Sequence, residues 1–311
     1  MYLVTGGAGF IGSNIAREAL ARGKKVRILD NFSTGHRANI ADIRDDVDII
    51  EGDIRSYHIV RNAMEDVEVV FHQGALPSVP RSIADPITTN EVNVQGTLNI
   101  LHAAVDSGCR RVIFASSSSI YGDAPEQIKS ERLPVRPLSP YAVSKLAGEK
   151  YMQVFHHIYG LETVALRYFN VFGPYQDPDS PYSAVIPLFI RAYLEERKPV
   201  INGDGLQSRD FTYIANVVHA NLLAADAKAA PGMMMNIACG DSITINRLAS
   251  EIGHLTNRTH IEPSHGPKRP GDVEHSRADI TLSSTVLGYE PVASFEEGLK
   301  NTVSFMRERW M

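Results

Sequence analysis

Tyr141 and Lys145 are the side chains of this sequence best placed to move a proton. They stand four positions apart after Ser139-Pro140, where Ser139 is a typical N-cap and Pro140 suits the first turn of a helix. Residues i and i+4 share one helix face, so the ammonium group would lie one turn from the phenol. Lowering a tyrosine pKa from ~10 to ~7 takes about 4 kcal/mol of electrostatic stabilisation. The pair therefore indicates a phenol base assisted by a cation, although a solvated helix face shows the same spacing.

A run of serines offers a second polar group for this chemistry. Ser117, Ser118 and Ser119 follow the predicted strand 111–116. Open α/β sheets bind their ligands at the carboxyl ends of the strands, so these hydroxyls would face a ligand. A hydroxyl there can hydrogen-bond a substrate hydroxyl and relay its proton to Tyr141. Taken alone, the run is equally compatible with a serine-rich loop.

A glycine-rich turn near the start of the chain predicts a phosphate-binding loop. Thr5-Gly6-Gly7-Ala8-Gly9-Phe10-Ile11-Gly12 reads as both GxxGxxG and GxGxxG, between a short apolar run and a helical pattern. Glycine permits the tight turn and the close approach of a pyrophosphate, and the helix N-terminus offers unpaired N–H groups. On its own, a glycine triplet is also compatible with a purely structural turn.

Asp30 makes the phosphate loop more specific. It ends the predicted strand 25–30, 18 residues after Gly12, where an acid that binds ribose hydroxyls is expected. An acid here repels a 2′-phosphate and favours NAD over NADP. Asp53, after the next predicted strand, either contacts the adenine or caps a helix. The sequence thus predicts an NAD site, and the positive ring of oxidised nicotinamide would also help Tyr141 lose its proton.

Short apolar runs alternate with helical patterns along the first half of the chain, which predicts an α/β fold with a Rossmann-type, doubly wound parallel sheet. The predicted strands are 2–4, 25–30, 47–51, 67–72, 111–116 and 163–167, and the predicted helices are 11–22, 57–64, 93–107 and 141–159. Proline and glycine interrupt the pattern after residue 170. We therefore expect an NAD-binding domain over 1–170, completed by a later strand near 236–238, and a smaller α+β substrate domain mainly over 171–311.

The composition excludes several classes of protein. The chain has 311 residues, 43% hydrophobic and 22% charged, with a net charge of −5, so a disordered or fibrous protein is excluded and no basic stripe suggests nucleic-acid binding. No run approaches the ~20 apolar residues of a membrane span. Cys109 and Cys239 lack metal-ligand or disulfide spacing. No metal site, nucleic-acid partner or membrane partner is expected, and the predicted location is the cytoplasm.

Taken together, these motifs resemble the extended short-chain dehydrogenases/reductases, specifically the NAD-dependent sugar-nucleotide 4-epimerase family. The resemblance covers essentially the whole chain. Its motifs are Thr5–Gly12, Asp30-Asn31, Asp53-Ile54, His72–Ala75, Asn93–Thr97, the serine run, Tyr141 with Lys145, Arg167–Pro174, Gly203–Gly205, Arg209–Phe211 and Arg269–Asp272.

The resemblance implies roles for individual residues. It makes Tyr141 the base, Ser117 the catalytic hydroxyl and Lys145 the ligand of the nicotinamide ribose. Asn170, Arg209 and Arg269 would hold the diphosphate of a UDP-sugar, and Asp272 its uridine ribose. The implied coenzyme contacts, besides Tyr141 and Lys145, are Gly6, Gly9, Phe10, Ile11, Gly12, Asp30, Asn31, Asp53, Ile54, Gln73, Ala75 and Asn93. A homodimer is also implied, through a four-helix interface formed by helices 93–107 and 141–159.

Other positions bear on the sugar. The family's dehydratases carry Thr-Asp-Glu where this chain has serines 117–119, which disfavours dehydration. Ser276 aligns with a gatekeeper that is tyrosine in enzymes restricted to plain hexoses, and a small residue leaves room for an N-acetyl group. With Ser78 and Val185, it resembles the branch that acts on UDP-N-acetylglucosamine. A UDP-glucose 4-epimerase, a UDP-uronate decarboxylase or epimerase, and an NAD-sensing scaffold remain the alternatives.

Overall fold

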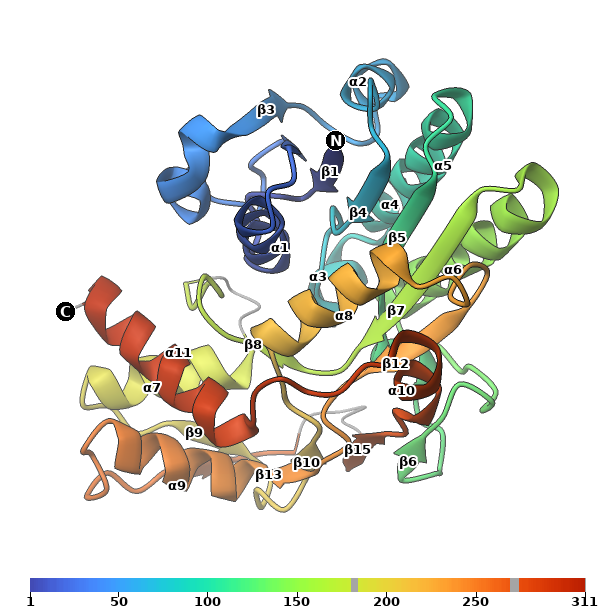
Figure 1. Cartoon of the computed structure of the whole chain (residues 1–311). Helices are drawn as coiled ribbons and strands as arrows, with labels where there is room; N and C mark the ends of the chain where they lie inside the picture. The colour runs from blue at the N-terminus through green and yellow to red at the C-terminus, as the bar shows by residue number, and fades with distance from the viewer. Residues whose placement is uncertain (180–183, 269–273, 311) are drawn as a thin grey trace.

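The centre of the molecule is a single parallel sheet. The computed structural model describes residues 1–179, 184–268 and 274–310 (Figure 1). The strand order is β3-β2-β1-β4-β5-β7-β12, and each neighbouring pair is parallel. This is the Rossmann arrangement that the sequence predicted. The strands are β1 (Tyr2–Thr5), β2 (Val26–Asp30), β3 (Val47–Glu51), β4 (Val69–His72), β5 (Arg111–Ser117), β7 (Glu162–Tyr168) and β12 (Met234–Ile237).

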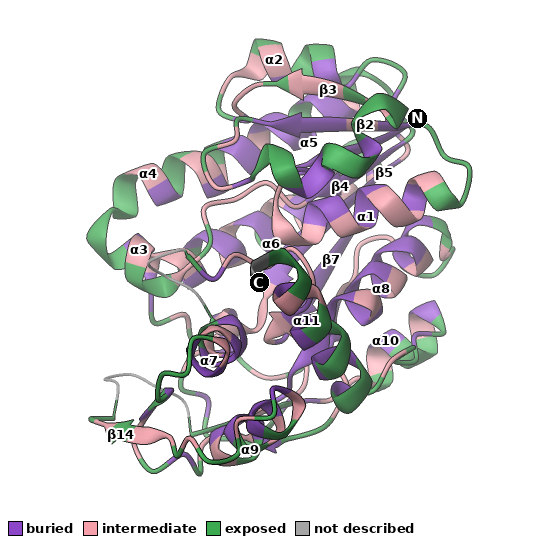
Figure 2. Ribbon diagram, turned by 90° about the vertical axis from the view of Figure 1, so that its left-hand side faces the viewer, coloured by how far each residue is buried: buried purple, intermediate pink, exposed green. Residues whose placement is uncertain are grey.

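Helices cover both faces of this sheet. α1 (Phe10–Ala21) and α8 (Ile214–Asp226) pack against each other on one face, and α2 (Tyr57–Ala63), α5 (Gly96–Asp106) and α6 (Pro140–Tyr159) cover the other (Figure 1). Because they are covered on both sides, β1, β4 and the middle of β5 are buried throughout, and Figure 2 shows the inner strands in purple. Burial on both faces explains why these strands read as continuous apolar runs rather than as alternating ones.

The chain returns to the main sheet after residue 170. β12 pairs with β7, Asn236 opposite Arg167, close to residues 236–238, where the sequence leads us to expect a late strand. α8 precedes it and packs on the sheet as well. The main sheet is therefore built from two separate stretches of the sequence.

The remaining elements form a smaller part beside the carboxyl ends of the strands. α7, α9 and α11 pack together there, below the main sheet in Figure 1. The small sheets have the orders β13-β10-β15-β6, β11-β8 and β14-β9. The strands of these small sheets are β6 (Ile128–Lys129), β8 (Val171–Phe172), β9 (Val200–Asn202), β10 (Ser208–Arg209), β11 (Thr212–Tyr213), β13 (Ile243–Thr244), β14 (Ser264–Gly266) and β15 (His275–Ala278). The helices in this stretch of the chain are α7 (Val185–Leu194), α9 (Ile245–Leu255), α10 (Thr281–Leu287) and α11 (Phe295–Trp310).

The helix α6 has the ends that its sequence predicts. Ser139 Oγ accepts from the Ala142 N–H (3.2 Å), and Pro140 occupies the first turn. Gly160 ends the helix in the left-handed conformation at φ +68°, which an L-residue adopts only with strain.

The predicted helix 93–107 begins differently from expectation. A π-helical turn spans Glu91–Gln95, after the short helices α3 (Val79–Ala84) and α4 (Pro86–Asn90), and only then does α5 start. The Asn93 carbonyl accepts from the Thr97 hydroxyl at 2.6 Å, so a side chain competes with the backbone for this carbonyl. Such turns concentrate at functional sites.

In the part of the chain that the structure describes, no helix combines the length and apolarity needed to traverse a bilayer.

Candidate active site

The topology itself marks a ligand-binding crevice. β1 is flanked by β2 on one side and by β4 on the other. The chain adds β2 and β3 on one side of β1 and then crosses back to add β4 and β5 on the other side, so the switch point lies between β1 and β4. Open α/β sheets bind ligands at this switch point, beyond the carboxyl ends of the strands. A cavity of about 600 Å³ lies there. The predicted phosphate loop contributes to its lining through Gly6, Gly9 and Gly12.

The glycine turn forms one wall of this cavity. Gly6 has φ +65°, and a Cβ on Gly12 would lie 2.2 Å from the Gly6 carbonyl oxygen, so both positions require glycine. Gly9 precedes α1 without a side-chain cap, and the first turn of α1 carries no acid. The N–H groups and the positive end of the helix dipole are thus left for an anion such as a pyrophosphate.

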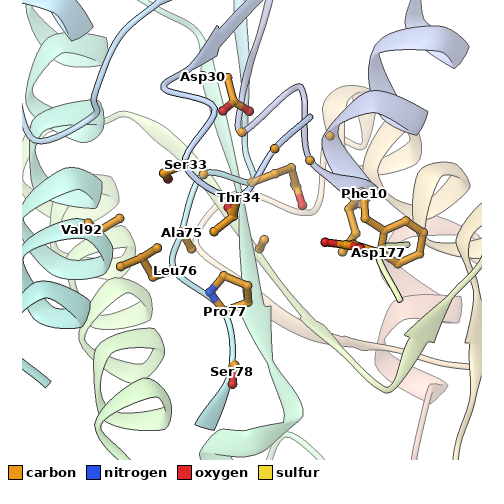
Figure 3. A pocket seen from close by; sticks show the side chains of 18 of the residues that line it. Phe10, Asp30, Ser33, Thr34, Ala75, Leu76, Pro77, Ser78, Val92 and Asp177 are labelled. Atoms are coloured by element: carbon orange, nitrogen blue, oxygen red, sulfur yellow. The ribbon is translucent and has the colours of Figure 1, made fainter. Parts of the chain in front are cut away.

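Asp30 lies at one end of the cavity (Figure 3). Its Oδ2 accepts from the Ala8 N–H (2.9 Å) and its Oδ1 from the Phe32 N–H (2.8 Å). These bonds hold the carboxylate in place and leave each oxygen a lone pair for a ribose hydroxyl. Burial raises the pKa of Asp30, while the two backbone bonds oppose this rise. Nearby, Asn31 donates to Asp53 Oδ2 (3.0 Å).

The segment after β4 forms the opposite wall. Figure 3 shows Ala75, Leu76 and Pro77 leading down the cavity to Ser78. Ser78 has φ +95°, an uncommon conformation for a non-glycine residue, and its Oγ caps α3 by accepting from the Arg81 N–H (3.3 Å). Asn93 lies behind this wall: its Oδ1 accepts from the Leu76 N–H (2.7 Å) and its Nδ2 donates to the Leu76 carbonyl (3.1 Å). Asn93 therefore supports the wall rather than facing the cavity.

Tyr141 and Lys145 line the same cavity, on one face of α6. Lys145 Nζ donates to the Ala115 carbonyl (2.9 Å) and lies 5.9 Å from the centre of the Tyr141 ring. Burial lowers the pKa of Lys145 to about 7. Burial also raises the pKa of Tyr141, and a hydrogen bond with Ser117 acts in the opposite direction. In the protein alone, burial outweighs this hydrogen bond, whereas the lowering predicted from the sequence also counts on the positive ring of oxidised nicotinamide.

A second cavity of about 560 Å³ adjoins the first, and Ala184 lines both. Asn170, Val185 and Arg209 line this second cavity. Asn170 has φ +30°, and its Nδ2 donates to the Asp210 carbonyl (3.2 Å). The cavity also borders Arg197 and Lys198, so several cations surround it. A diphosphate would find complementary charge here.

Most of the residues singled out from the sequence come together at these two cavities. The first is lined by Gly6, Gly9, Phe10, Ile11, Gly12, Asp30, Asn31, Asp53, Ile54, Gln73, Ala75, Ser78, Tyr141 and Lys145. Ser117 joins them through its hydrogen bond with Tyr141. Ser276 pairs with Arg209 across the β10–β15 ladder, beside the second cavity. Arg269 and Asp272 lie outside the described residues.

Sequence reasoning missed Gln176. This residue lines the first cavity, and its Oε1 is buried without a hydrogen-bond partner. A buried acceptor of this kind is suited to a donor on a ligand. It lies in the irregular stretch after Gly173-Pro174, where no periodicity in the sequence indicates which side chain turns inward. The loop that follows Pro174 folds back onto α1, where Asn14 donates to the Pro174 carbonyl (3.2 Å). This tertiary contact, which the sequence pattern does not show, brings Gln176 to the cavity.

The histidines that might suggest a metal have other partners. His275 Nδ1 lies 2.9 Å from Ser208 Oγ, and His265 Nδ1 lies 2.8 Å from the Gly203 carbonyl. Within residues 1–179, 184–268 and 274–310, no group of three or more His, Cys, Asp or Glu is arranged to hold a metal ion. Burial raises the pKa of both Cys109 and Cys239 to about 11, which makes them poor nucleophiles.

Comparison with known proteins agrees with this geometry. Residues 2–238 match the NAD dependent epimerase/dehydratase family. The chain belongs to this family. A relative in this epimerase/dehydratase family, a putative UDP-glucose 4-epimerase of Methanocaldococcus jannaschii, is 37% identical over 99% of this chain and 98% of its own. A UDP-N-acetyl-alpha-D-glucosaminuronate decarboxylase of Bacillus cytotoxicus is 34% identical over 98% of this chain and 97% of its own.

Solved structures of the epimerase/dehydratase family superpose on nearly the whole chain. A UDP-N-acetylglucosamine 4-epimerase from Methanobrevibacter ruminantium, in complex with UDP-N-acetylmuramic acid, has a TM-score of 0.94 and 42% identity over 99% of this chain and 98% of its own. A Thermus thermophilus UDP-glucose 4-epimerase in complex with NAD has a TM-score of 0.89 and 36% identity over 98% of both chains.

NAD is the coenzyme of the family, and the first cavity fits it. The glycine cradle admits a pyrophosphate because a Cβ at Gly12 would fill it. The uncapped start of α1 supplies donors, and the Asp30 carboxylate, held by two backbone N–H groups, offers acceptors of the kind that ribose hydroxyls need. The Lys145 ammonium and the Tyr141 phenol line the same cavity. The cavity therefore offers groups that suit the pyrophosphate and the ribose hydroxyls of a dinucleotide.

Proposed function

We propose that this protein epimerises UDP-hexoses at C4, with UDP-N-acetylglucosamine and UDP-N-acetylgalactosamine as the favoured pair and UDP-glucose and UDP-galactose also accepted. One observation carries the proposal. A Ser117–Tyr141 pair stands beside Lys145 in a dinucleotide cavity, and a second, cation-lined cavity adjoins it. A phenol base, a coenzyme site and a diphosphate site in this arrangement suit reversible oxidation of a sugar hydroxyl.

Tyr141 and Ser117 would move the proton. Tyr141 takes the proton of the sugar O4, with Ser117 hydrogen-bonded to the same hydroxyl. Bound NAD would supply the acceptor for the hydride that leaves C4, and would give it back to the opposite face of the 4-keto sugar. Lys145 holds the nicotinamide ribose and places its charge one turn from the phenol. The 4-keto sugar must turn over before the proton returns, so the site has to hold the nucleotide firmly and the sugar loosely.

The second cavity would hold the UDP group. Asn170 and Arg209 line it and are proposed to bind the diphosphate, together with Arg269, while Asp272 binds the uridine ribose. A guanidinium binds two phosphate oxygens at once, which gives both affinity and orientation. Fixing the diphosphate leaves the bonds between it and the sugar ring free to rotate.

Three features favour the acetylated sugar. Ser276 is small and lies next to Arg209 in the sheet, so the space beside C2 is not filled by an aromatic ring. Ser78 lies on the wall of the first cavity and Val185 on that of the second, in segments that resemble the UDP-N-acetylglucosamine branch. The Methanobrevibacter relative of 42% identity is a UDP-N-acetylglucosamine 4-epimerase. A small gatekeeper permits both kinds of sugar, so activity on UDP-glucose is also expected.

The decisive experiment is incubation of the purified protein with UDP-N-acetylglucosamine without added coenzyme, followed by NMR of the anomeric protons. We expect UDP-N-acetylgalactosamine to appear until equilibrium is reached. Tyr141→Phe should lower kcat by about 10²- to 10⁴-fold, because the general base is lost while the ring is kept. Absence of any product with the acetylated sugars, but turnover of UDP-glucose, would establish the UDP-glucose 4-epimerase alternative instead.

A second candidate is a nucleotide-sugar decarboxylase on the same scaffold. The Bacillus relative of 34% identity is named as such an enzyme. Incubation with UDP-glucuronate and its acetylated counterpart distinguishes the two, because only a decarboxylase releases carbon dioxide and produces NMR signals of a pentose. An NAD-sensing scaffold would show neither reaction.

We also propose a homodimer built on α5 and α6. Val143, Val154 and Ile158 are 53%, 45% and 64% exposed on α6, spaced so that they lie along one side of the helix. An exposed apolar stripe of this kind is typical of a protein interface. In a twofold dimer the α5–α6 pair of one copy would pack on the same pair of the other.

A further inference from the structure

His72 lies buried at the switch point of the sheet, between the two walls of the NAD cavity. It is 1% exposed and ends β4, directly opposite Thr5 at the end of β1. Its Nδ1 lies 2.7 Å from Thr5 Oγ1, and its Nε2 lies 3.0 Å from Thr97 Oγ1. Both ring nitrogens therefore have a hydroxyl partner, and neither faces the cavity.

The donors and acceptors around the ring determine its tautomer. Thr97 Oγ1 lies 2.6 Å from the Asn93 carbonyl, which can only accept, so the single Thr97 hydroxyl proton points there. Thr97 must then accept from His72, which places a proton on Nε2. At the other side, Thr5 Oγ1 accepts from the Gly74 N–H (3.1 Å) and has its own proton free for Nδ1. The chain runs in one direction, from the Gly74 N–H through Thr5, His72 and Thr97 to the Asn93 carbonyl.

Each end of this chain reaches a part of the active site. Gly74 is on the cavity wall, and it approaches the phosphate loop so closely that a Cβ on Gly6 would lie 2.8 Å from the Gly74 Cα. Asn93 holds Leu76 by both its N–H and its carbonyl, and its Nδ2 also donates to Ser144 Oγ (3.0 Å). Ser144 Oγ in turn donates to the Tyr141 carbonyl (2.8 Å). The chain thus connects the phosphate loop with the helix turn that carries the base.

We propose that His72, as a neutral imidazole protonated at Nε2, is a positioning residue that holds the two walls of the NAD cavity and the start of α6 in register. It touches neither coenzyme nor substrate and acts through Thr5 and Gly74 on one side, and through Thr97 and Asn93 on the other. The inference depends on the coenzyme site and not on which sugar reacts.

A charged His72 would break the chain. A proton on Nδ1 would face Thr5 Oγ1, which already accepts from Gly74, so the Thr5 hydroxyl proton would lose its acceptor. Burial and the nearby Lys145 ammonium both disfavour the imidazolium, and the pKa of His72 falls to about 3. The ring also lies against Phe114, with 5.6 Å between ring centres. One tautomer is therefore stabilised across the working pH range.

The first test is ¹⁵N NMR of the histidine rings in the protein with NAD bound, the His72 signal being assigned by its loss in His72→Phe or, if that variant does not fold, in His72→Gln. We expect the shifts of a neutral ring protonated at Nε2, unchanged between pH 5.5 and 9. A proton on Nδ1, or titration within this range, would overturn the proposal. This readout does not require turnover, so it stands apart from any failure of the proposed epimerase activity.

The second test measures how fast NAD leaves the protein. Thr97→Val removes the acceptor for Nε2–H and Thr5→Val removes the donor to Nδ1, each with almost no change in shape. Each lost hydrogen bond should speed NAD release by roughly ten-fold, and His72→Gln, which keeps only the donor to Thr97, should resemble Thr5→Val. Thr163→Val is the matched control, because Thr163 is equally buried and donates to the Met152 carbonyl (2.8 Å) away from the cavity.

The comparison with the control separates positioning from general stability. Faster NAD release in Thr5→Val and Thr97→Val than in Thr163→Val, at matched losses of unfolding free energy, supports the proposal. Equal release rates in all three variants would show that the hydrogen-bond chain contributes only to the core.

Discussion

Arg209 and Ser276 lie opposite each other on the neighbouring parallel strands β10 and β15. The Asp210 N–H donates to the Ser276 carbonyl at 2.8 Å, so the two strands are firmly registered. Side chains paired across a ladder point to the same face of a sheet. The residue proposed to bind the diphosphate and the residue proposed to limit the size of the sugar are therefore positioned by the same pair of strands.

Ser276→Tyr should change the choice of sugar. A phenol ring in place of the hydroxymethyl group fills the space proposed for the N-acetyl group, so kcat/KM for UDP-N-acetylglucosamine should fall by about 10- to 100-fold. The value for UDP-glucose should change by less than about three-fold. Measuring both substrates with the variant, and with Ser276→Ala as a control that keeps the site open, checks this. Parallel losses for the two sugars would contradict the gatekeeper role.

Lys145 should make the stability of the coenzyme-stripped protein depend on pH. Its pKa is about 7 in the folded protein, against ~10.4 in an unfolded chain, so between these values the unfolded state binds more protons. Stability from this group then rises with pH above about 7, by at most about 1.4 kcal/mol per pH unit, and the cost of burying the charge is fully present below it. Urea unfolding of the wild type and of Lys145→Met between pH 6.5 and 9.5 measures the effect. A difference between them that stays constant with pH would rule it out.

Breaking the buried ion pair beneath the serine run should strongly destabilise the fold. Glu149 accepts from Arg167 Nε (2.9 Å) and Nη2 (2.8 Å), and also from Ser116 Oγ (2.6 Å), with both charged side chains almost fully buried. Glu149→Gln leaves the guanidinium without its counter-charge, at a cost of about 3–5 kcal/mol in urea unfolding. Glu195→Gln is the control: it weakens exposed pairs with Arg191 and Arg197 and should cost about 1 kcal/mol or less.

Charges on the outer side of α6 should separate the proposed dimer. Val154→Glu and Ile158→Glu place carboxylates on the exposed apolar stripe, and two copies would bring them together at a twofold interface. Light scattering after size exclusion should report a dimer for the wild type and a monomer for the double variant. Val292→Glu serves as the comparison, since Val292 is 57% exposed and lies outside α5 and α6. A wild type that elutes as a monomer would exclude the dimer.

The succession of strands and helices along the first half of the chain could be predicted from the sequence because it depends on local pattern. Continuous apolar runs mark strands covered on both faces, and the glycine turn, Asp30 and the Ser139–Pro140 helix start are local signals. Strand β3 was predicted at its observed bounds, 47–51, and α6 within one residue. The residues expected to bind NAD lie at strand ends, where such patterns point.

Long-range packing determined which other side chains line the cavity and how its titratable groups are charged. No local feature shows that Gln176 folds into the first cavity, or that Asn93 turns behind its wall to bind Leu76. The pKa of Tyr141 also depends on burial, which arises from elements far apart in the sequence and outweighs the hydrogen bond with Ser117. His72 gives the clearest case. Its sequence neighbours indicate only a strand end, whereas its charge and tautomer follow from Thr5 and Thr97, which only the folded sheet brings to its two ring nitrogens.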